Sequence, residues 1–390
     1  MFPDIPFAAV IHANPYPWYA TLVKERPLYF DAALRLWIAT SAEAVTAVLT
    51  RDRCRVRPVR EPVPPALLGS SAGDLFSQLV RMTDGDRHDS LKRAVSSALA
   101  LVDCDLVADQ SRRWARVLLR QRAVELLLNV EFALPVHVMG SVLGIPDALL
   151  LDTVLWMRDF VRCIAPGSSP DQIERGKLAA ERLSDMLQTV LTDAPETGLL
   201  AALRHELPDE TPAVVANAIG FLFQVHDATA GLIGNTVHAL AAHPELDLRH
   251  EDMHEVVLEV LRYDSPVQNT RRFVAEDGVI AGEMMRAGDT ILVVLAAANR
   301  DPASNPNPER FDIHRPNRRV FTFGAGVHAC PGDHFATTIA VAAVEQLLCD
   351  GRIPGQLTAP VTYHPSTNGR IPVLETLLEH SNAEGRLTKG

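Results

Sequence analysis

The sequence has few cysteines, and no two of them lie at the spacing of a metal knuckle. The five are Cys54, Cys104, Cys163, Cys330 and Cys349. They are odd in number and scattered along a chain of 390 residues, so a disulfide framework and a cysteine-rich zinc site are both disfavoured. At most one or two of these thiols are expected to have a chemical role.

Long hydrophobic runs are also missing. The longest, Ile291–Ala298, is far shorter than the roughly 20 residues that span a bilayer. The first residues, MFPDIPFAAVIHANPYPWY, lack a basic region followed by an apolar one, as a secretory signal would have. The sequence therefore predicts a soluble, cytoplasmic protein with no membrane partner.

Basic residues are in deficit, with 37 Lys and Arg against 48 Asp and Glu. Since duplex-binding proteins are normally basic, nucleic acid is excluded as the main partner. The hydrophobic fraction of 47% excludes a disordered chain. The length exceeds the roughly 250–300 residues at which single cores stop growing, which indicates one large divided domain or two domains.

The periodicity of apolar residues predicts a mainly α protein with a smaller β portion. Helical spacing dominates the regions of about 84–264 and 331–350, and the longest candidate helix is Thr211–Ala242 with Pro212 in its first turn. Strand-like patterns cover about 27–40, 267–298 and 352–377, and Asn368-Gly369 in the last region is a hairpin signal.

Residues 250–254 read His-Glu-Asp-Met-His, which fits the H-E-x-x-H signature of zinc proteases. On a helix, His250 and His254 would share a face and Glu251 could act as a base. However, such a short pattern arises easily by chance among 14 His and 48 acidic residues, and no third ligand follows. A solvated, charged first turn is the favoured interpretation, and a zinc hydrolase is kept as an alternative.

Residues 324–329 read Gly-Ala-Gly-Val-His-Ala, which resembles a dinucleotide-binding G-x-G-x-x-A. Such a motif belongs in a βαβ unit, usually with an acidic residue about 20 positions later. Here it lies near the C-terminus of a helical protein and Pro331 separates it from the next helix, so we disfavour this function.

The same segment extends to Phe323-x-x-Gly326-x-x-x-Cys330-x-Gly332. Glycines let a backbone wrap closely behind a thiolate and present N–H donors to it. A helix beginning after Gly332 would stabilise negative sulfur with its dipole. The segment resembles the haem-ligand loop of the cytochrome P450 family, which implies that Cys330 binds the iron and that Phe323 and Gly332 also contact the cofactor.

Further motifs carry the same resemblance in the family's order and spacing. Glu259-Val-Leu-Arg262 resembles its E-x-x-R, and residues 308–312, Pro-Glu-Arg-Phe-Asp, resemble its meander segment. The resemblance implies that Arg310 completes a structural cluster with Glu259 and Arg262. For Arg300 and Arg315, a surface ion pair remains the default interpretation. The likeness covers most of the chain and implies one P450 domain over residues 1–390, with haem b beneath a long distal helix.

Haem propionates need cationic or hydrogen-bonding partners. By resemblance these are His88, Arg272 and His328. The family usually has arginine four residues after the first of these, whereas this chain has Lys92, a point charge in place of a bidentate fork. Arg93 is an alternative partner.

The long helix departs from the family pattern Ala-Gly-x-acid-Thr-Thr, in which the acid and the first threonine relay protons for O–O cleavage. Gln224 and Val225 replace the small residues, Asp227 is the acid, and Ala228 stands at the relay threonine. A methyl group cannot pass a proton. Thr229 follows, about 100° around the helix.

Three explanations stay open for Ala228. A substrate hydroxyl could complete the relay, Gln224 or Thr229 could replace it with waters and Asp227, or the reaction could proceed without efficient protonation. Helix packing is the favoured role of Thr229, and His226 is predicted to face away from the haem.

The resemblance implies a monooxygenase that uses O2 and electrons from a ferredoxin-type partner to hydroxylate a small molecule of secondary metabolism. By resemblance, residues 267–270 are among the segments that face the substrate; they combine the apolar Val267 with the polar Gln268 and Asn269, which suggests a mainly apolar substrate with at least one polar group. A cationic docking face is expected at Lys92, Arg93, Arg112, Arg113 and Arg116. A haem-binding sensor without turnover is the other alternative.

Overall fold

The computed structural model describes residues 3, 5–120, 130–165, 167–193, 197–246, 252–351 and 361–373. Two compact units are distinguished: residues 1–54, 115–131 and 227–390 form unit 1, and residues 55–114 and 132–226 form unit 2. The single domain expected from the sequence stays a prediction. Within the described ranges, no helix combines the length and the apolarity needed to cross a bilayer.

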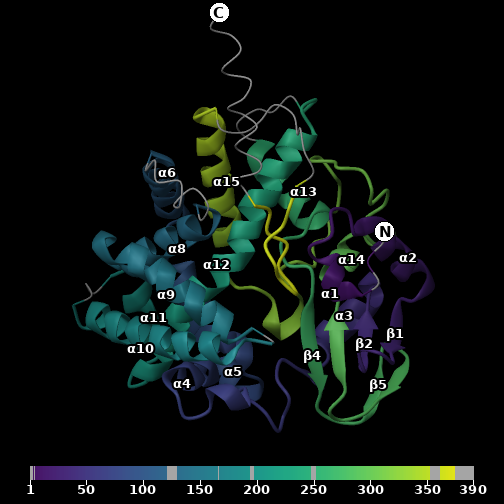
Figure 1. Cartoon of the computed structure of the whole chain (residues 1–390), viewed down its shortest axis with the longest axis horizontal. Coiled ribbons are helices and arrows are strands. Elements are labelled where there is room, and N and C mark those ends of the chain that lie inside the picture. Colours follow the sequence, from purple (N-terminus) through teal and green to yellow (C-terminus); the bar gives the residue numbers. More distant parts are fainter. Residues whose placement is uncertain are drawn as a thin grey trace, which may run out of the picture. The chain divides into compact units, whose positions relative to one another are not determined.

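The five-stranded sheet has the order β1-β2-β7-β4-β3 and lies in unit 1, except that the second residue of β3 belongs to unit 2. Figure 1 labels β1, β2 and β4 of this sheet. β2 pairs antiparallel with β1 and parallel with β7, and β7 pairs antiparallel with β4. The strands are β1 Leu28–Asp31, β2 Leu36–Ala39, β3 Cys54–Arg55, β4 Thr270–Val274 and β7 Thr290–Val293, with a separate hairpin of β5 Gly278–Ile280 and β6 Glu283–Met285. Strands β1 and β2 lie within the expected β region 27–40, and β4 to β7 lie within 267–298, which ends in a helix.

Strand β7 explains the apolar run in the sequence, because it is buried on both faces. Ile291 and Val293 pack into one apolar cluster with residues of α3 (Ala42–Thr50), whereas Leu292 packs into another with Tyr19 of α2 (Tyr16–Glu25). Alternate residues of a strand point to opposite faces, so both faces of this central strand must be apolar. The other helices of unit 1 are α1 Pro6–Ala9, α2 Tyr16–Glu25, α3 Ala42–Thr50, α13 Met253–Tyr263, α14 Leu295–Asn299 and α15 Asp333–Cys349.

Unit 2 is helical. Its elements are η1 Pro65–Leu67, α4 Ser71–Gln78, η2 Val80–Met82, α5 Gly85–Ala100, α6 Cys104–Arg120, α8 Val130–Leu143, η3 Asp147–Leu149, α9 Leu150–Cys163, α10 Pro170–Asp193 and α11 Leu199–Glu206, of which α6 ends and α8 begins within unit 1. The longest helix, α12 Thr211–Ala242, begins in unit 2 and ends in unit 1. These bounds confirm the predicted helix at Thr211–Ala242.

Of the predicted C-terminal β region, residues 352–360 and 374–377 lie outside the described part. Between them, the backbone N–H of His364 donates to the carbonyl of Ile371, and that of Val373 donates to Thr362, both at 2.9 Å. The chain reverses between these pairs, as the Asn368-Gly369 signal predicts.

In unit 1, α12 lies against the segment that follows α13 and against this hairpin. A Cβ on Gly231 would lie 2.8 Å from the carbonyl oxygen of Arg370 and 3.0 Å from Cβ of Pro266. Four residues later, Nδ2 of Asn235 donates to the carbonyl of Asp264 at 2.7 Å. The helix is thus held at a separation that only glycine permits at position 231.

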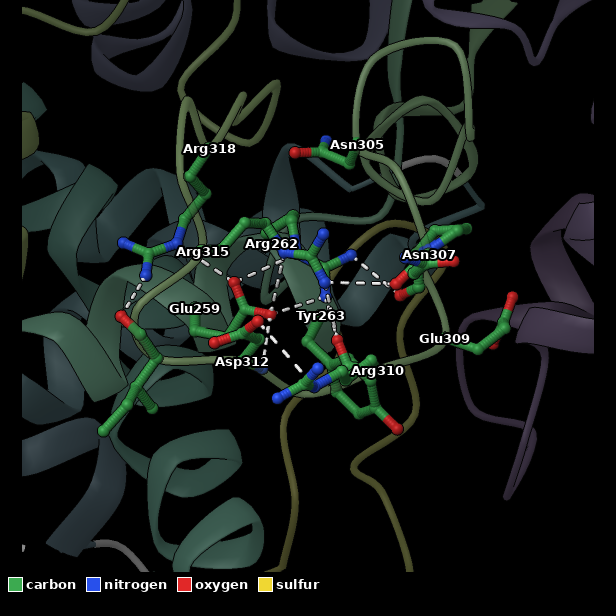
Figure 2. Close-up of polar contacts among 12 residues, drawn as sticks. Glu259, Arg262, Tyr263, Asn305, Asn307, Glu309, Arg310, Asp312, Arg315 and Arg318 are labelled. Atoms are coloured by element: carbon green, nitrogen blue, oxygen red, sulfur yellow. Dashed lines mark hydrogen bonds and ion pairs between the residues drawn. The ribbon is translucent and has the colours of Figure 1, made fainter.

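A buried cluster on α13 fixes the irregular segment that precedes the cysteine loop (Figure 2). Glu259 and Arg262 are fully buried, and the Arg262 guanidinium donates to both Glu259 oxygens at 3.1 and 2.6 Å. Nε of Arg315 donates to Oε1 of Glu259 at 3.3 Å, and Nε of Arg318 donates to Oε2 at 3.0 Å.

The prediction that Arg310 completes this cluster is wrong. Its side chain is 74% exposed and lies near Asp312, and only its backbone carbonyl accepts from Arg262 and Arg315. The predicted surface role of Arg315 is also wrong, because that side chain is buried on Glu259. Arg300 is buried too: its guanidinium stacks on Tyr263 while it pairs with the exposed Glu309.

We predict that Gly231→Ala lowers the free energy of unfolding. Overpacking costs about 1–3 kcal/mol, which exceeds the helix-propensity gain of about 1 kcal/mol. Gly220→Ala is the matched control on the same helix, because its Cβ would meet only the flexible end of Leu79, at 3.1 Å. Urea denaturation measures both, and equal effects of the two changes would contradict the tight approach at Gly231.

We also predict that Arg315→Met costs about 3 kcal/mol, because it leaves part of the buried Glu259 charge uncompensated. Arg310→Met should stay within about 0.5 kcal/mol, as expected for an exposed side chain. Urea denaturation midpoints of both variants check this. A larger loss for Arg310→Met than for Arg315→Met would restore the original assignment.

Candidate functional site

The cysteine loop is a tightly wound turn between Phe321 and α15. The backbone N–H of Cys330 donates to the carbonyl of Phe323 at 2.8 Å, and that of Ala329 donates to Gly326 at 3.0 Å. Gly326 has a φ of +69°, and a Cβ there would lie 2.8 Å from the carbonyl oxygen of Leu49. The loop therefore needs glycine at this position for both conformation and space.

The base of the loop is fixed by Asn299, a buried residue for which the sequence analysis predicts no role. Its Oδ1 accepts from the backbone N–H of Phe321 at 2.6 Å, and its Nδ2 donates to Ser265 at 2.7 Å and Thr322 at 2.9 Å. In the sequence, the one sign of this role is that the amide of Asn299 directly follows the apolar run Ile291–Ala298. A buried asparagine with its hydrogen bonds satisfied rigidifies the turn that carries Cys330.

The chemistry of the five thiols separates Cys330 from the rest. Burial raises the pKa of Cys54 to about 11 and that of Cys163 to about 12, which keeps both protonated near neutrality. Cys104 is exposed at the first residue of α6, and Cys349 is exposed at the last residue of α15. Cys330 alone among the five lies half-buried in a loop, two residues before Gly332 and the N-terminus of α15. These residues fit a thiolate-bound haem.

The other predicted haem contacts lie on several elements. Phe323 and His328 are half-buried parts of the same loop, and Arg272 is a buried residue of β4 in unit 1. His88 and Lys92 are one turn apart on α5 of unit 2. Nδ1 of His88 lies 3.0 Å from the carbonyl oxygen of Val80, which orients the ring. Their roles toward a propionate stay predictions.

The helix α12 presents one less-buried face in its middle. Gln224, Asp227 and Ala228 are half-buried and lie at positions i, i+3 and i+4, on the same side. Thr229 is 1% exposed and lies on the packed side, as the sequence analysis favours. His226 is also buried, and its ring stacks on Phe132 of α8 with centroids 5.0 Å apart. The side chain of His226 therefore packs between helices.

The expectation that Gln268 and Asn269 face the substrate is wrong. Gln268 has no exposed surface, and its amide bonds the hydroxyls of Tyr19 and Tyr16 at 3.1 and 3.3 Å. Asn269 is 3% exposed and donates to the carbonyl of Thr367 at 2.9 Å. Both amides serve the structure of unit 1.

The predicted docking residues lie on α5 and α6. Arg93 is exposed and Lys92 is half-buried. Arg112 pairs with Asp109 at 3.2 Å, and Arg113 pairs with Asp147. The guanidinium charges are therefore partly offset by acidic neighbours, which weakens the field expected from the sequence.

The zinc alternative gains no support. His250 lies outside the described residues, and the side chain of His254 is 57% exposed beside Glu255 in the first turn of α13. Among the described residues, no group of three or more His, Cys, Asp or Glu side chains could hold a metal ion. The predicted solvated first turn matches what is seen of His254.

Comparisons with known proteins agree on one family. The family model described as cytochrome P450 matches residues 251–349. The vitamin D(3) 25-hydroxylase of Pseudonocardia autotrophica is 30% identical over 363 residues, 88% of each chain. The cytochrome P450 monooxygenase PikC of Streptomyces venezuelae is 28% identical over 358 residues, which are 86% of this chain and 83% of PikC.

The crystal structure of CalO2 has a TM-score of 0.83 and 26% identity, and the match covers 95% of this chain and 97% of CalO2. The match to the cytochrome P450 family model includes both the Glu259 cluster of α13 and the cysteine loop, and the relatives align over most of the chain. Proteins of this kind bind haem b, use O2 and receive electrons from redox partner proteins. The chain belongs to the cytochrome P450 family and is an oxidoreductase of the monooxygenase type.

Proposed function

We propose that this P450 hydroxylates a mainly apolar small molecule of secondary metabolism, with electrons from a ferredoxin-type partner. The observation that carries the proposal is the Cys330 loop, in which a half-buried thiol precedes a helix N-terminus behind a glycine that cannot be replaced. Two relatives named as hydroxylases, those for vitamin D(3) and for 6-deoxyerythronolide B, support the reaction type.

Cys330 would hold the haem iron, and Phe323, His328, Gly332, Arg272, His88 and Lys92 would contact the remainder of the cofactor. When bound, haem b supplies an iron centre that reduces O2 with two electrons and cleaves its O–O bond, aided by thiolate donation. The N-terminal dipole of α15, which begins three residues after Cys330, would favour negative charge on a sulfur bound to the iron. Arg272 and His328 would place positive or hydrogen-bonding groups against propionate oxygens.

The half-buried face of α12 decides how protons can reach the reacting oxygen. Asp227 can take a proton from solvent, but Ala228 cannot pass it on. Thr229 is packed on another side of the helix, so its hydroxyl is a poor substitute. Gln224 lies one turn before Ala228 on the same face, and its amide can orient a water beside Asp227. Gln224 is therefore the proposed replacement for the relay threonine.

The substrate's own chemistry follows from the corrected contacts. Because the amides of Gln268 and Asn269 are used internally, polar recognition falls to Gln224 and Asp227. Val267 is half-buried and packs partly against the apolar cluster of the sheet, and Thr270 is also half-buried; the methyl groups that each leaves exposed would face the substrate. A mainly apolar molecule with a hydroxyl directed toward α12 fits this set, and that hydroxyl would share the relay with Gln224.

We predict that Cys330→Ser abolishes the long-wavelength Soret band of the reduced carbon monoxide complex, because serine cannot supply a soft thiolate. Cys349→Ser, an exposed change on α15, is the control and should retain the band. An unchanged band in Cys330→Ser would reject this ligand. Consumption of O2 with a ferredoxin and its reductase separates an enzyme from a haem sensor.

We predict that Gln224→Leu diverts electrons from product to hydrogen peroxide, with coupling falling about tenfold or more, since positioned proton donors contribute roughly 10²-fold or more. Ala228→Thr in the same chain should restore coupling by returning a hydroxyl beside Asp227. The substrate is one found by its spin-state shift, and peroxide and product are measured separately.

Thr229→Val is the matched control for this experiment and should leave the coupling unchanged. Unaltered coupling in Gln224→Leu would exclude the glutamine. If coupling then fell with a substrate analogue lacking its hydroxyl, the substrate would carry the relay alone.

A further inference from the structure

Two segments about 100 residues apart in the sequence form one hydrogen-bonded element in unit 1. We call residues 266–269 and 366–370 the paired segments. The N–H of Gln268 donates to the carbonyl of Asn368, and that of Arg370 donates to Pro266, both at 2.8 Å. Val267 bridges Gly369 between them, and the Asn269 amide donates to Thr367. The two segments are therefore joined into one hydrogen-bonded unit.

A single side chain, Arg370, anchors the paired segments. It is 1% exposed, and each of its guanidinium nitrogens donates a hydrogen bond. Nε donates to Asp264 at 2.7 Å, Nη1 to the carbonyls of Val10 and His12 at 3.0 and 2.7 Å, and Nη2 to Ala13 at 3.2 Å and to Tyr363 Oη at 2.6 Å. The N-terminal segment, the end of α13 and the hairpin thus meet at one charge.

Asp264 provides the opposite charge and is itself held on several sides. Its Oδ1 also accepts from the Tyr16 hydroxyl at 2.6 Å, and its Oδ2 lies 3.8 Å from Nδ1 of His238 on α12. Burial alone would raise the pKa of Asp264, but Arg370 and His238 hold it well below its usual range. The carboxylate therefore stays charged at neutral and mildly acidic pH.

The pair also sets the distance between the paired segments and α12. The carbonyl of Arg370 accepts from Nδ2 of Asn235 at 3.3 Å and lies close against the place that a Cβ on Gly231 would take. Removing one partner of a buried pair leaves the other charge uncompensated, which loosens whatever the pair holds. Here the held element is the surface that carries Val267.

We propose that Arg370 and Asp264 are positioning residues for substrate selection, which hold the paired segments against α12 as one rigid wall of the substrate site. This inference rests on the proposed function, in which Val267 faces the substrate. Neither side chain contacts the substrate, since both are buried in the cluster with Tyr16 and Tyr363.

The test compares Arg370→Gln and Asp264→Asn with Asp301→Asn in the haem-loaded protein. Asp301 is a matched buried carboxylate of unit 1, 5% exposed, whose oxygens accept from the backbone of Ala42 and Ala303. Exchange of the backbone amide hydrogens of residues 268 and 370 should quicken at least tenfold for the first two changes only. If Arg370→Gln does not fold, Tyr363→Phe removes one of its acceptors and takes its place.

The second readout is the ratio of dissociation constants for 4-phenylimidazole and imidazole, read from the haem spectrum. Imidazole needs little space, whereas the phenyl ring must fit the wall, so the ratio should shift at least threefold for the first two variants and stay fixed for Asp301→Asn. Faster exchange with an unchanged ratio would overturn the selective role, and unchanged exchange would overturn the anchoring role. Loss of the reduced carbon monoxide band in the parent protein would instead reject the proposed function.

Discussion

One buried carboxylate, Glu259, determines where the irregular chain before the cysteine loop can lie. Three guanidinium groups, those of Arg262, Arg315 and Arg318, donate to its two oxygens. A charge without solvent must be compensated by partners of good geometry, and the surplus donors must find acceptors too. Backbone carbonyls of residues 306–313 accept them, so a segment without helix or strand is fixed by hydrogen bonds to arginine. The cysteine loop starts from this fixed segment.

The sequence predicts the positions of side chains best where they follow helical spacing. The pairing of Glu259 with Arg262 and the packed position of Thr229 follow from 3.6 residues per turn, and the structure agrees with both. In the irregular segment no such period exists. Of the arginines at 310, 315 and 318, sequence cannot tell which turn inward, and the family likeness selected the exposed one.

The amides of Gln268 and Asn269 show a second limit of prediction from the sequence. From sequence, two polar residues after α13 suggest a surface that recognises the substrate, because the sequence does not show hydrogen-bond partners that are distant along the chain. Tyr19 and Thr367, which use these amides, lie about 250 and 100 residues away. Buried amides are normally satisfied within the fold, and here that requirement outweighs recognition. In the proposed function, polar contacts with the substrate therefore fall to Gln224 and Asp227 on the half-buried face of α12.

Helix α13 connects the two constraints. Glu259 in its middle fixes the segment leading to Cys330, and Asp264, directly after its last residue, fixes the paired segments through Arg370. The two carboxylates are five residues apart, so helix α13 positions both the segment that leads to Cys330 and the paired segments on the proposed substrate side of unit 1. Packed helices are not continuously deformable, so a substitution at either carboxylate is felt at both. Substrate selection and iron ligation are therefore expected to change together along α13, whereas changes on the face of α12 are expected to act on proton delivery and on the polar part of the substrate.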